Sequence, residues 1–124
     1  MEAGETFKRS YGVHLWVVVS DPAKDSQRVL IVNMTTVRNR FHDPACVLNA
    51  GDHREVKHQT YMNYRDSRIV RNSALEAQLS TGQIAVNEKV SECVLDRIRR
   101  GAASSDYIPM AHRELLVEQG LAEP

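Results

Sequence analysis

The stretch HLWVVVSDP, residues 14–22, determines the expected fold class of this chain. Leu15–Val19 is a continuous apolar run rich in valine, as expected of a buried β-strand, and the Ser-Asp-Pro that follows ends it. In the next apolar run, VLIVNMTT, Val29–Met34 predicts a second strand. The link SDPAKDSQ is rich in turn-forming residues and too short for a helical crossover. The two runs therefore predict a pair of adjacent antiparallel strands.

More short strands are expected before residue 72. The segments at Ala45–Leu48, around Thr60–Tyr64 and at Ser67–Val70 have strand-like composition, and NAGDHREVKH between them predicts a loop. Several short strands separated by frequent breakers favour a small, curled sheet or barrel. We therefore expect a β-barrel body over residues 1–71, with its strands within residues 5–71.

The pattern then changes to helix, over residues 72–124. SALEAQL predicts a short helical turn, and MAHRELLVEQG predicts a short last helix. Between them, STGQIAVNEKVSECVLDRIRRG predicts one long helix, in which Ser80 and Gln83 have the spacing of a capping box and Gly101 is the expected end. We expect a single α+β domain over residues 1–124, with this helical part following the β body.

The composition is that of a globular protein. Apolar residues make up 42% and charged residues 26% of the chain, and no apolar stretch approaches the roughly 18 residues that span a bilayer. The segment MEAGETFKRSYG is polar and resembles neither a signal nor a transit peptide. Cys46 and Cys93 lie far apart without metal-site spacing, which favours two buried, reduced thiols in a cytoplasmic protein over a disulfide.

Charge is distributed unevenly although the net charge is zero. Residues 1–71 carry 11 Lys and Arg against 8 Asp and Glu, a balance of +3, whereas residues 72–124 carry 5 against 8, a balance of −3. Four of the five histidines also lie in the first part. Such a gradient favours an anionic ligand on the N-terminal part of the chain.

Polar groups at the two strand ends are candidates for chemistry. Histidine titrates near neutral pH, so His14 before the first strand can accept or donate a proton, although it can also simply finish that strand. Thr35 and Thr36 end the second strand, and their hydroxyls with Arg38 and Arg40 can hold a phosphate. The plainer interpretation is a β-branched strand end before a solvated basic loop. Because antiparallel pairing brings the start of one strand beside the end of the next, we expect His14 and the threonines at one rim.

The segment GDHREVKHQTYMNYRDSR, residues 51–68, interleaves basic and aromatic residues. This composition suits single-stranded RNA, because bases stack on rings while phosphates meet cations. A polar surface loop leading into an edge strand is the alternative. The histidines have neither the i, i+4 spacing nor a Cys/His cluster, so no metal or other cofactor is expected. The candidate RNA-binding residues here are Asp52, His53, Arg54 and Tyr61.

In their order, these segments resemble the MazF/PemK-like family of toxins from bacterial toxin–antitoxin systems. The family has an early strand of the form small-apolar-Val-Leu-Ser, here LWVVVS, and a second strand that ends in Thr-Ser or a near equivalent, here VLIVNMTT. A Ser-Tyr-Val segment leads into a final strand, here TYMNYRDSRIV, and a helical region opens on Leu-Ser, here LSTGQIAVNEKVSECVLDRI. The resemblance covers residues 10–100 and rests on the order and spacing of short motifs.

The resemblance implies an SH3-like barrel that forms a homodimer, is inhibited by a cognate antitoxin protein, and cleaves single-stranded mRNA without a metal through attack of the ribose 2′-OH. In the family, an Arg-Pro pair before the first strand and a Thr or Ser after the second act on the phosphate. Thr35 or Thr36 matches the hydroxyl, whereas His14 and Leu15 stand where Arg-Pro would be. The catalytic residues implied are thus His14, Thr35 and Thr36. The negative charge of the phosphorane would then be stabilised by Arg38, Arg40 or Arg54.

Two other functions remain open. The same barrel can serve as a non-catalytic toxin or binding module that acts on a protein target such as DNA gyrase, or on nucleic acid, and the missing Arg-Pro pair favours this. A third possibility is a small scaffold whose helices dock a partner through Val90 and Val94. The leading hypothesis from the sequence is a metal-independent endoribonuclease toxin.

Overall fold

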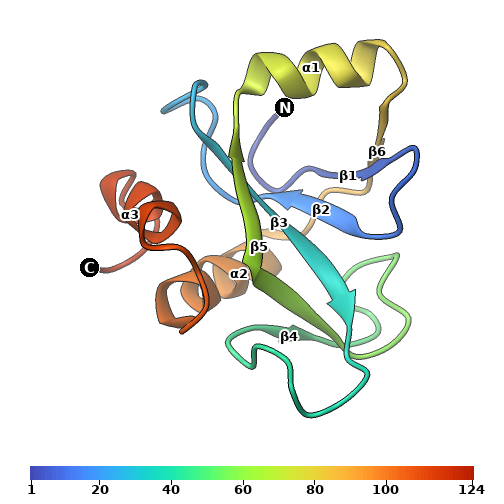
Figure 1. Cartoon of the computed structure of the whole chain (residues 1–124), viewed down its shortest axis with the longest axis vertical. Coiled ribbons are helices and arrows are strands. Elements are labelled where there is room, and N and C mark those ends of the chain that lie inside the picture. The colour runs from blue at the N-terminus through green and yellow to red at the C-terminus, as the bar shows by residue number, and fades with distance from the viewer.

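The computed structural model describes residues 1–124 as one six-stranded antiparallel sheet with three helices, which confirms the α+β class (Figure 1). The order of the strands across the sheet is β4-β5-β3-β2-β1-β6. The strands are β1 (Thr6–Arg9), β2 (Leu15–Val18), β3 (Val29–Thr36), β4 (Val47–Leu48), β5 (Thr60–Val70) and β6 (Ile84–Asn87). The helices are α1 (Asn72–Ser80), α2 (Glu92–Ser104) and α3 (Met110–Glu118). None of the three has the length and apolar content needed to cross a bilayer.

The centre of the sheet is β3, which pairs with β2 on one side and β5 on the other. The predicted antiparallel pairing of the first two apolar runs is confirmed, with Leu15 opposite Met34 and Val18 opposite Ile31. Residues 29–34 are all buried because apolar groups cover both faces of the sheet along this part of β3. This is why the run has no polar alternation.

Alternate residues of the central strands point to opposite faces of the sheet and belong to two separate hydrophobic cores. The larger core lies between one face of the sheet and α2 and α3, and Val17, Val32 and Met62 belong to it. The smaller core lies on the opposite face, where Trp16 and Ile31 pack with Leu75 of α1. Figure 1 shows α1 at the top of the molecule, away from α2 and α3. Each face of the sheet therefore has its own helical cover.

β5 is a single strand of 11 residues, where the sequence predicted two short ones. Its pairing with β3 is interrupted by a bulge: Asn33 lies opposite Asn63, whereas Ile31 lies opposite Arg68. Inside the bulge, Ser67 Oγ donates a hydrogen bond of 2.7 Å to the Tyr64 carbonyl. The hydroxyl thus satisfies a carbonyl that the interrupted ladder leaves free.

The sheet does not close, because β4 and β6 lie at opposite edges and do not pair with each other. The expected SH3-like barrel is therefore not confirmed. The expected confinement of the strands to residues 5–71 is also wrong, since β6 comes from the part predicted to be helical. β6 completes the sheet by pairing with β1, with Phe7 opposite Val86.

The long helix predicted to start at Ser80 is wrong. Its first half forms β6 and a link, and the helix α2 starts after Ser91, whose side chain accepts a hydrogen bond of 3.2 Å from the Val94 N–H. Strand pairing with β1 outweighs the helical periodicity of this segment. Cys93, expected on the buried face, is exposed; Cys46 is buried, and burial raises the pKa of its thiol.

Gly101 lies inside α2, although the sequence predicted that it ends the helix. A Cβ at this position would come within 2.7 Å of Cys46 Cβ and would also collide with Tyr64 Oη. Tyr64 is fully buried, and its hydroxyl donates a hydrogen bond of 2.7 Å to the Ile98 carbonyl. The glycine therefore lets α2 approach β5 closely enough for this bond to form.

Gly101→Ala is expected to destabilise the fold by about 1–3 kcal/mol, because overpacking at a close contact outweighs the helix propensity of alanine. Urea denaturation measures the change. Cys93→Ala, at an exposed position of the same helix, is the control and should leave the free energy of unfolding nearly unchanged. A Gly101→Ala protein as stable as the wild type would contradict this account of the α2–β5 contact.

α3 is attached to β5 through His112. Because Ser67 Oγ donates its proton to the Tyr64 carbonyl, the 2.8 Å contact between Ser67 Oγ and His112 Nδ1 requires the imidazole to be the donor. Burial lowers the pKa of His112, since the charged imidazolium loses hydration there. The folded protein thus favours the neutral form of this side chain.

Stability is expected to fall as the pH drops below about 6.5, the usual value for histidine in an unfolded chain. In that range the unfolded chain binds a proton that the folded chain does not, so acidification favours unfolding; above it, the contribution is constant. Urea midpoints between pH 7.5 and 5.5 should decline less in His112→Gln than in the wild type. His58→Gln, at an exposed position, should keep the decline of the wild type. Equal slopes in the two variants would contradict the role of His112.

Candidate nucleic-acid interface

The register of the sheet puts four functional side chains in one row. Thr35 is opposite Tyr61 in the β3–β5 ladder. The β2–β3 ladder ends with Leu15 opposite Met34 and the β1–β2 ladder with Lys8 opposite Leu15, so His14 and Arg9 come one position after these last pairs, and His14 lies at a bend just before β2. Side chains directly opposite each other in a sheet lie on the same face, with Cβ atoms about 5 Å apart. Thr35 and Tyr61 are such a pair, and continuing the alternation of β1 and β2 puts Arg9 and His14 at the same end of this face; we call the four residues the cross-strand row.

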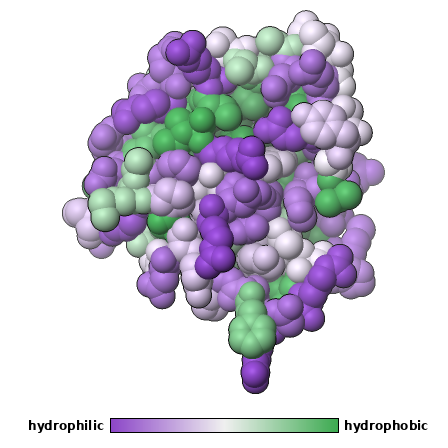
Figure 2. Space-filling view, viewed as in Figure 1, coloured by the Kyte–Doolittle hydropathy of each residue, from purple (hydrophilic) through white to green (hydrophobic).

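This row lies on the face that carries the smaller core, beyond the part that α1 covers. Next to the row, Trp16 is flanked by two guanidinium groups, that of Arg9 at 5.5 Å and that of Arg68 at 5.7 Å from the ring centroid. Figure 2, in the view of Figure 1, shows hydrophilic side chains across much of the lower half of the molecule. We call this surface the basic face, defined by Arg9, His14, Trp16, Thr35, Tyr61, Arg65 and Arg68.

A short chain of hydrogen bonds fixes the centre of the basic face. Thr35 Oγ1 donates to Asn33 Oδ1 at 2.9 Å, and Asn33 Nδ2 donates to Asp66 Oδ2 at 2.8 Å. Arg68 approaches the other oxygen of Asp66 at 3.3 Å. Asn33 is fully buried, so its amide needs both partners. The chain leaves the lone pairs of the Thr35 hydroxyl free to accept further hydrogen bonds.

A cavity of about 430 Å³ opens at the β4 end of the basic face. Its walls are planar groups: the His42 ring lies 5.5 Å from the Tyr61 ring, and the Arg65 guanidinium lies 4.7 Å from the Tyr107 ring centroid. We call it the Tyr61 cavity; its lining also includes Arg40, Phe41 and Asn63.

Thr35 and Thr36 do not share a site, contrary to the expectation from sequence. Adjacent residues of a strand point to opposite faces, so Thr36 lies on the other side of the sheet from Thr35. There it lines a small cavity of about 120 Å³ with Lys8 and Thr60. The pairing of both hydroxyls on one phosphate is therefore wrong.

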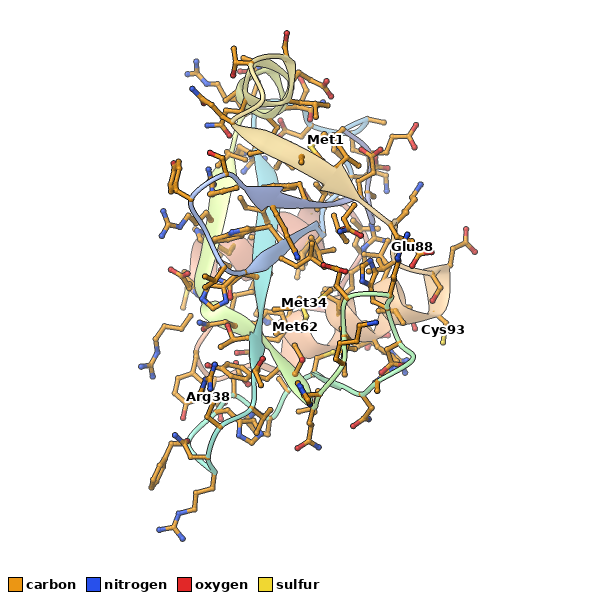
Figure 3. All side chains as sticks on the ribbon, turned by 90° about the vertical axis from the view of Figure 1, so that its right-hand side faces the viewer. Met1, Met34, Arg38, Met62, Glu88 and Cys93 are labelled. Carbon is orange, nitrogen blue, oxygen red and sulfur yellow. The ribbon has the colours of Figure 1, made fainter.

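Arg38 and Arg40, in the loop after β3, lie on the side of the basic face and not on the side of Thr36. Figure 3 views the sheet from its side, with Glu88 and Cys93 on one side of it and Arg38 on the other, beyond the end of β3. Arg38 is exposed and pairs with no acidic residue. Arg40 lines the Tyr61 cavity, with its guanidinium 5.1 Å from the Phe41 ring.

The other predicted RNA-binding residues lie across the sheet from His14. His53 is 5% exposed; its Nε2 donates to the Glu88 carbonyl at 2.6 Å and its Nδ1 accepts from the Glu55 N–H at 3.0 Å. Both ring nitrogens are therefore used to hold the loop against the segment before α2. Asp52 forms an ion pair of 3.2 Å with Arg97, and Arg54 is exposed on the same loop. None of the three joins the cross-strand row.

Several residues of this surface were not identified from the sequence. The missed residues are Arg9, Trp16, His42, Asn63 and Tyr107. For Arg9 and Trp16 the signal was present: once β1, β2 and β3 are aligned by their alternation, both fall on the face of His14. His42 and Tyr107 come from loops, and local sequence patterns do not place loop residues in space.

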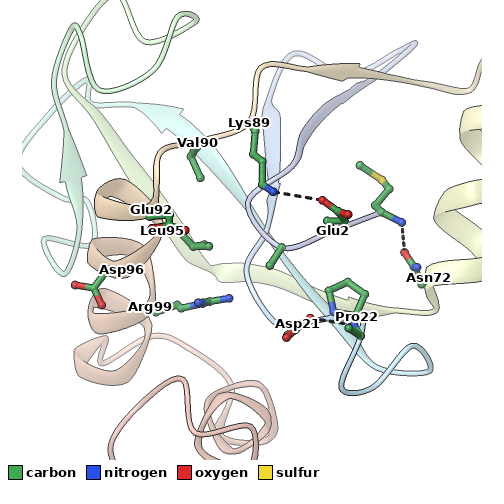
Figure 4. Close-up of a pocket in the computed structure, with 13 residues that line it drawn as sticks. Glu2, Asp21, Pro22, Asn72, Lys89, Val90, Glu92, Leu95, Asp96 and Arg99 are labelled. Atoms are coloured by element: carbon green, nitrogen blue, oxygen red, sulfur yellow. Dashed lines mark hydrogen bonds and ion pairs between the residues drawn. The ribbon is translucent and has the colours of Figure 1, made fainter.

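The largest cavity, of about 680 Å³, lies elsewhere, between the N-terminal segment, the β2–β3 link and α2 (Figure 4). Arg99 extends into it and donates through Nε to the Val19 carbonyl at 2.9 Å. Burial lowers the pKa of this guanidinium, although the nearby carboxylates of Asp21 and Asp96 act to raise it. The lining acids outnumber the lining Lys and Arg, so the cavity disfavours a nucleic-acid backbone.

No group of three His, Cys, Asp or Glu side chains comes together in a way that could hold a metal ion. Comparisons with family models, curated proteins and solved structures find no match for this chain. The function is therefore inferred from the chain's own residues.

Asp66→Ala is expected to cost about 1–3 kcal/mol of unfolding free energy, because the buried amide of Asn33 loses its acceptor. Asp66→Asn keeps an oxygen at this position and should cost less. Asp106→Ala, at an exposed position without a hydrogen-bond partner, is the control and should be neutral. Denaturation midpoints measure all three, and an Asp66→Ala protein as stable as the control would contradict the hydrogen-bond chain.

Proposed function

We propose that this protein binds single-stranded RNA on the basic face and cleaves it without a metal. The observation that carries the proposal is the cross-strand row, which brings a histidine, a threonine hydroxyl and an arginine to one end of the same face, beyond the part that α1 covers. The ordered resemblance to the MazF/PemK-like toxins supports the same reaction.

The basic face has what a single strand needs for binding. Arg9, Arg65 and Arg68 supply cations for the phosphates, and the rings of Tyr61 and of the adjoining Tyr61 cavity supply flat surfaces for stacking of bases, whereas Trp16 is buried against Arg9 and Arg68. Stacking on an aromatic ring is worth about 1–3 kcal/mol per base and tolerates any base. A base-paired duplex keeps its bases inside and cannot use these rings, so the ligand we infer is unpaired RNA.

The proposed reaction uses the row as follows. His14 accepts the proton of the ribose 2′-OH while that oxygen forms a bond to phosphorus. Arg9 donates hydrogen bonds to the charged phosphorane, and Thr35 adds a donor when its hydroxyl turns from Asn33 Oδ1, to which it donates in the free protein. The bond from phosphorus to the 5′ oxygen then breaks, and the imidazolium of His14 or a water molecule returns a proton to that oxygen. The products are a 2′,3′-cyclic phosphate and a 5′-hydroxyl.

Arg9 also accounts for the departure from the family's motif. In the resemblance, an arginine is expected at the position of His14. Here Arg9 follows the last β1–β2 pair on the neighbouring strand, and its guanidinium lies on the same face, 5.5 Å from the Trp16 ring centroid. The positive charge that the phosphorane requires is therefore proposed to come from β1. If the resemblance holds further, a cognate antitoxin covers this face and the active species is a homodimer.

A 3′-fluorescent RNA without secondary structure is expected to be cleaved by the purified protein in EDTA. His14→Ala should lower the rate about 10²–10⁴-fold, as loss of a general base does. Thr35→Val should also lower it, by a smaller factor. His58→Ala, at an exposed position outside the cross-strand row, is the matched control and should cleave at the wild-type rate.

A substrate with 2′-deoxyribose at the cleaved position should remain intact, because it lacks the attacking hydroxyl. The wild type must still bind this oligonucleotide, which fluorescence anisotropy measures. Cleavage of the deoxy substrate, or an unchanged rate in His14→Ala, would contradict the proposed mechanism.

Passive binding of single-stranded nucleic acid is the second candidate, and one observation favours it. His14 makes no side-chain hydrogen bond within the protein, whereas a catalytic base is usually oriented by a third group. Tight binding of RNA without any product after long incubation would support this function in place of cleavage.

A further inference from the structure

The Tyr61 cavity holds hydrogen-bonding capacity that the protein does not use. Asn63 is half-buried and its side-chain amide makes no hydrogen bond within the chain, and the same is true of the Tyr61 hydroxyl. Asp43 in the same cavity is different, because it accepts from the Ala45 N–H at 3.0 Å and from the Ser105 hydroxyl at 2.6 Å. The free amide therefore stands out as the group available to a ligand.

The walls of the cavity favour a flat ligand. Tyr61 and His42 are inclined by 40° to each other, and Tyr107 lies under the guanidinium of Arg65. Aromatic rings and guanidinium planes are the surfaces on which unstacked bases of single-stranded RNA are held. The volume of about 430 Å³ lies within the usual range of small-molecule sites, so one base with its sugar can enter.

The position of the cavity links it to the cross-strand row. Tyr61 belongs both to the cavity and to the row, in which it lies directly opposite Thr35. Asn63 is two residues further along β5 and therefore on the same face. A base held against Tyr61 would thus belong to a nucleotide close to the phosphate at Thr35.

We propose that the Tyr61 cavity is a base-specificity subsite, in which one adenine of the bound RNA stacks on Tyr61 and is recognised by the Asn63 amide. This inference rests on the proposed function, because it assumes that RNA occupies the basic face. An amide presents an N–H donor beside a carbonyl acceptor, and adenine presents a ring-nitrogen acceptor beside its N6 amine. This complementarity is why asparagine pairs with adenine in a bidentate manner.

The test uses the full chain and 2′-O-methyl hexanucleotides, which cannot be cleaved through the 2′ position. Five uridines surround one variable position that carries adenine, guanine, cytosine, uracil or no base. Fluorescence anisotropy should show about tenfold tighter binding with adenine than with the abasic position. The other three bases should bind more weakly than adenine.

Two variants separate recognition from stacking. Asn63→Leu should remove the preference for adenine but keep the affinity for the abasic oligonucleotide. Tyr61→Leu should lower the affinity for every base and leave the abasic oligonucleotide nearly unaffected. Asn49→Leu, at an exposed position that does not line the cavity, is the matched control and should bind like the wild type. Circular dichroism and thermal unfolding confirm that each variant is folded.

The outcomes distinguish this inference from the proposed function. Loss of the adenine preference in Asn63→Leu supports the subsite even if the wild type fails to cleave ordinary RNA. Equal affinity for all four bases, or a preference that survives Asn63→Leu, overturns the subsite while cleavage still stands. Failure to bind any hexanucleotide overturns the subsite and the proposed function together.

Discussion

The pairing of β3 with both β2 and β5 is the constraint on which the rest of the molecule depends. Side chains alternate between the two faces, so a shift of one residue in either ladder would exchange the apolar and polar sets of that strand. The observed register sends Val32 and Met34 to the larger core and Ile31 to the smaller one. The same register puts Thr35, and not Thr36, on the face of His14. Core packing and the composition of the candidate site are thus fixed by one set of backbone hydrogen bonds.

The uneven cover of the sheet explains why a site exists at all. α1 has 9 residues and buries only Leu75 against the smaller core. α1 begins directly after β5 and lies across that end of the sheet at the top of Figure 1, so it covers this end only. β5 has 11 residues at about 3.3 Å each, so its other end, near Tyr61, lies far beyond the helix. The part of this face that α1 leaves uncovered is solvated, and polar and basic side chains occupy it.

The sequence predicted those parts of the fold that depend on local patterns. The runs at Val29–Met34 and Leu15–Val19 and the short link between them were enough to predict an antiparallel pair. β6 was missed because Ile84–Asn87 is short and becomes a strand only by pairing with β1, a partner that no local window contains. The helical spacing of Val86, Val90 and Val94 was therefore taken for one helix.

Only some residues of the candidate site were predicted from the sequence. His14 and Thr35 were identified because strand ends can be recognised from the sequence, and pairing of neighbouring strands brings such ends together. His53 was predicted to bind RNA from its basic and aromatic neighbours. The sequence could not reveal its burial or its hydrogen bond to the Glu88 carbonyl, because both depend on a distant segment of the chain. Arg9 was missed because its role follows only from a ladder between strands that the sequence did not predict as a pair.

The pairing of β1 with β6 also has a consequence for how the chain reaches this structure. Phe7 and Val86 are partners although 79 positions separate them along the chain. During synthesis, β1 emerges from the ribosome early and keeps one unpaired edge until β6 is made. Contacts between such distant residues slow folding, and an open strand edge invites association with other chains. The interval before β6 arrives is therefore the stage at which a nascent chain of this protein is most exposed to aggregation.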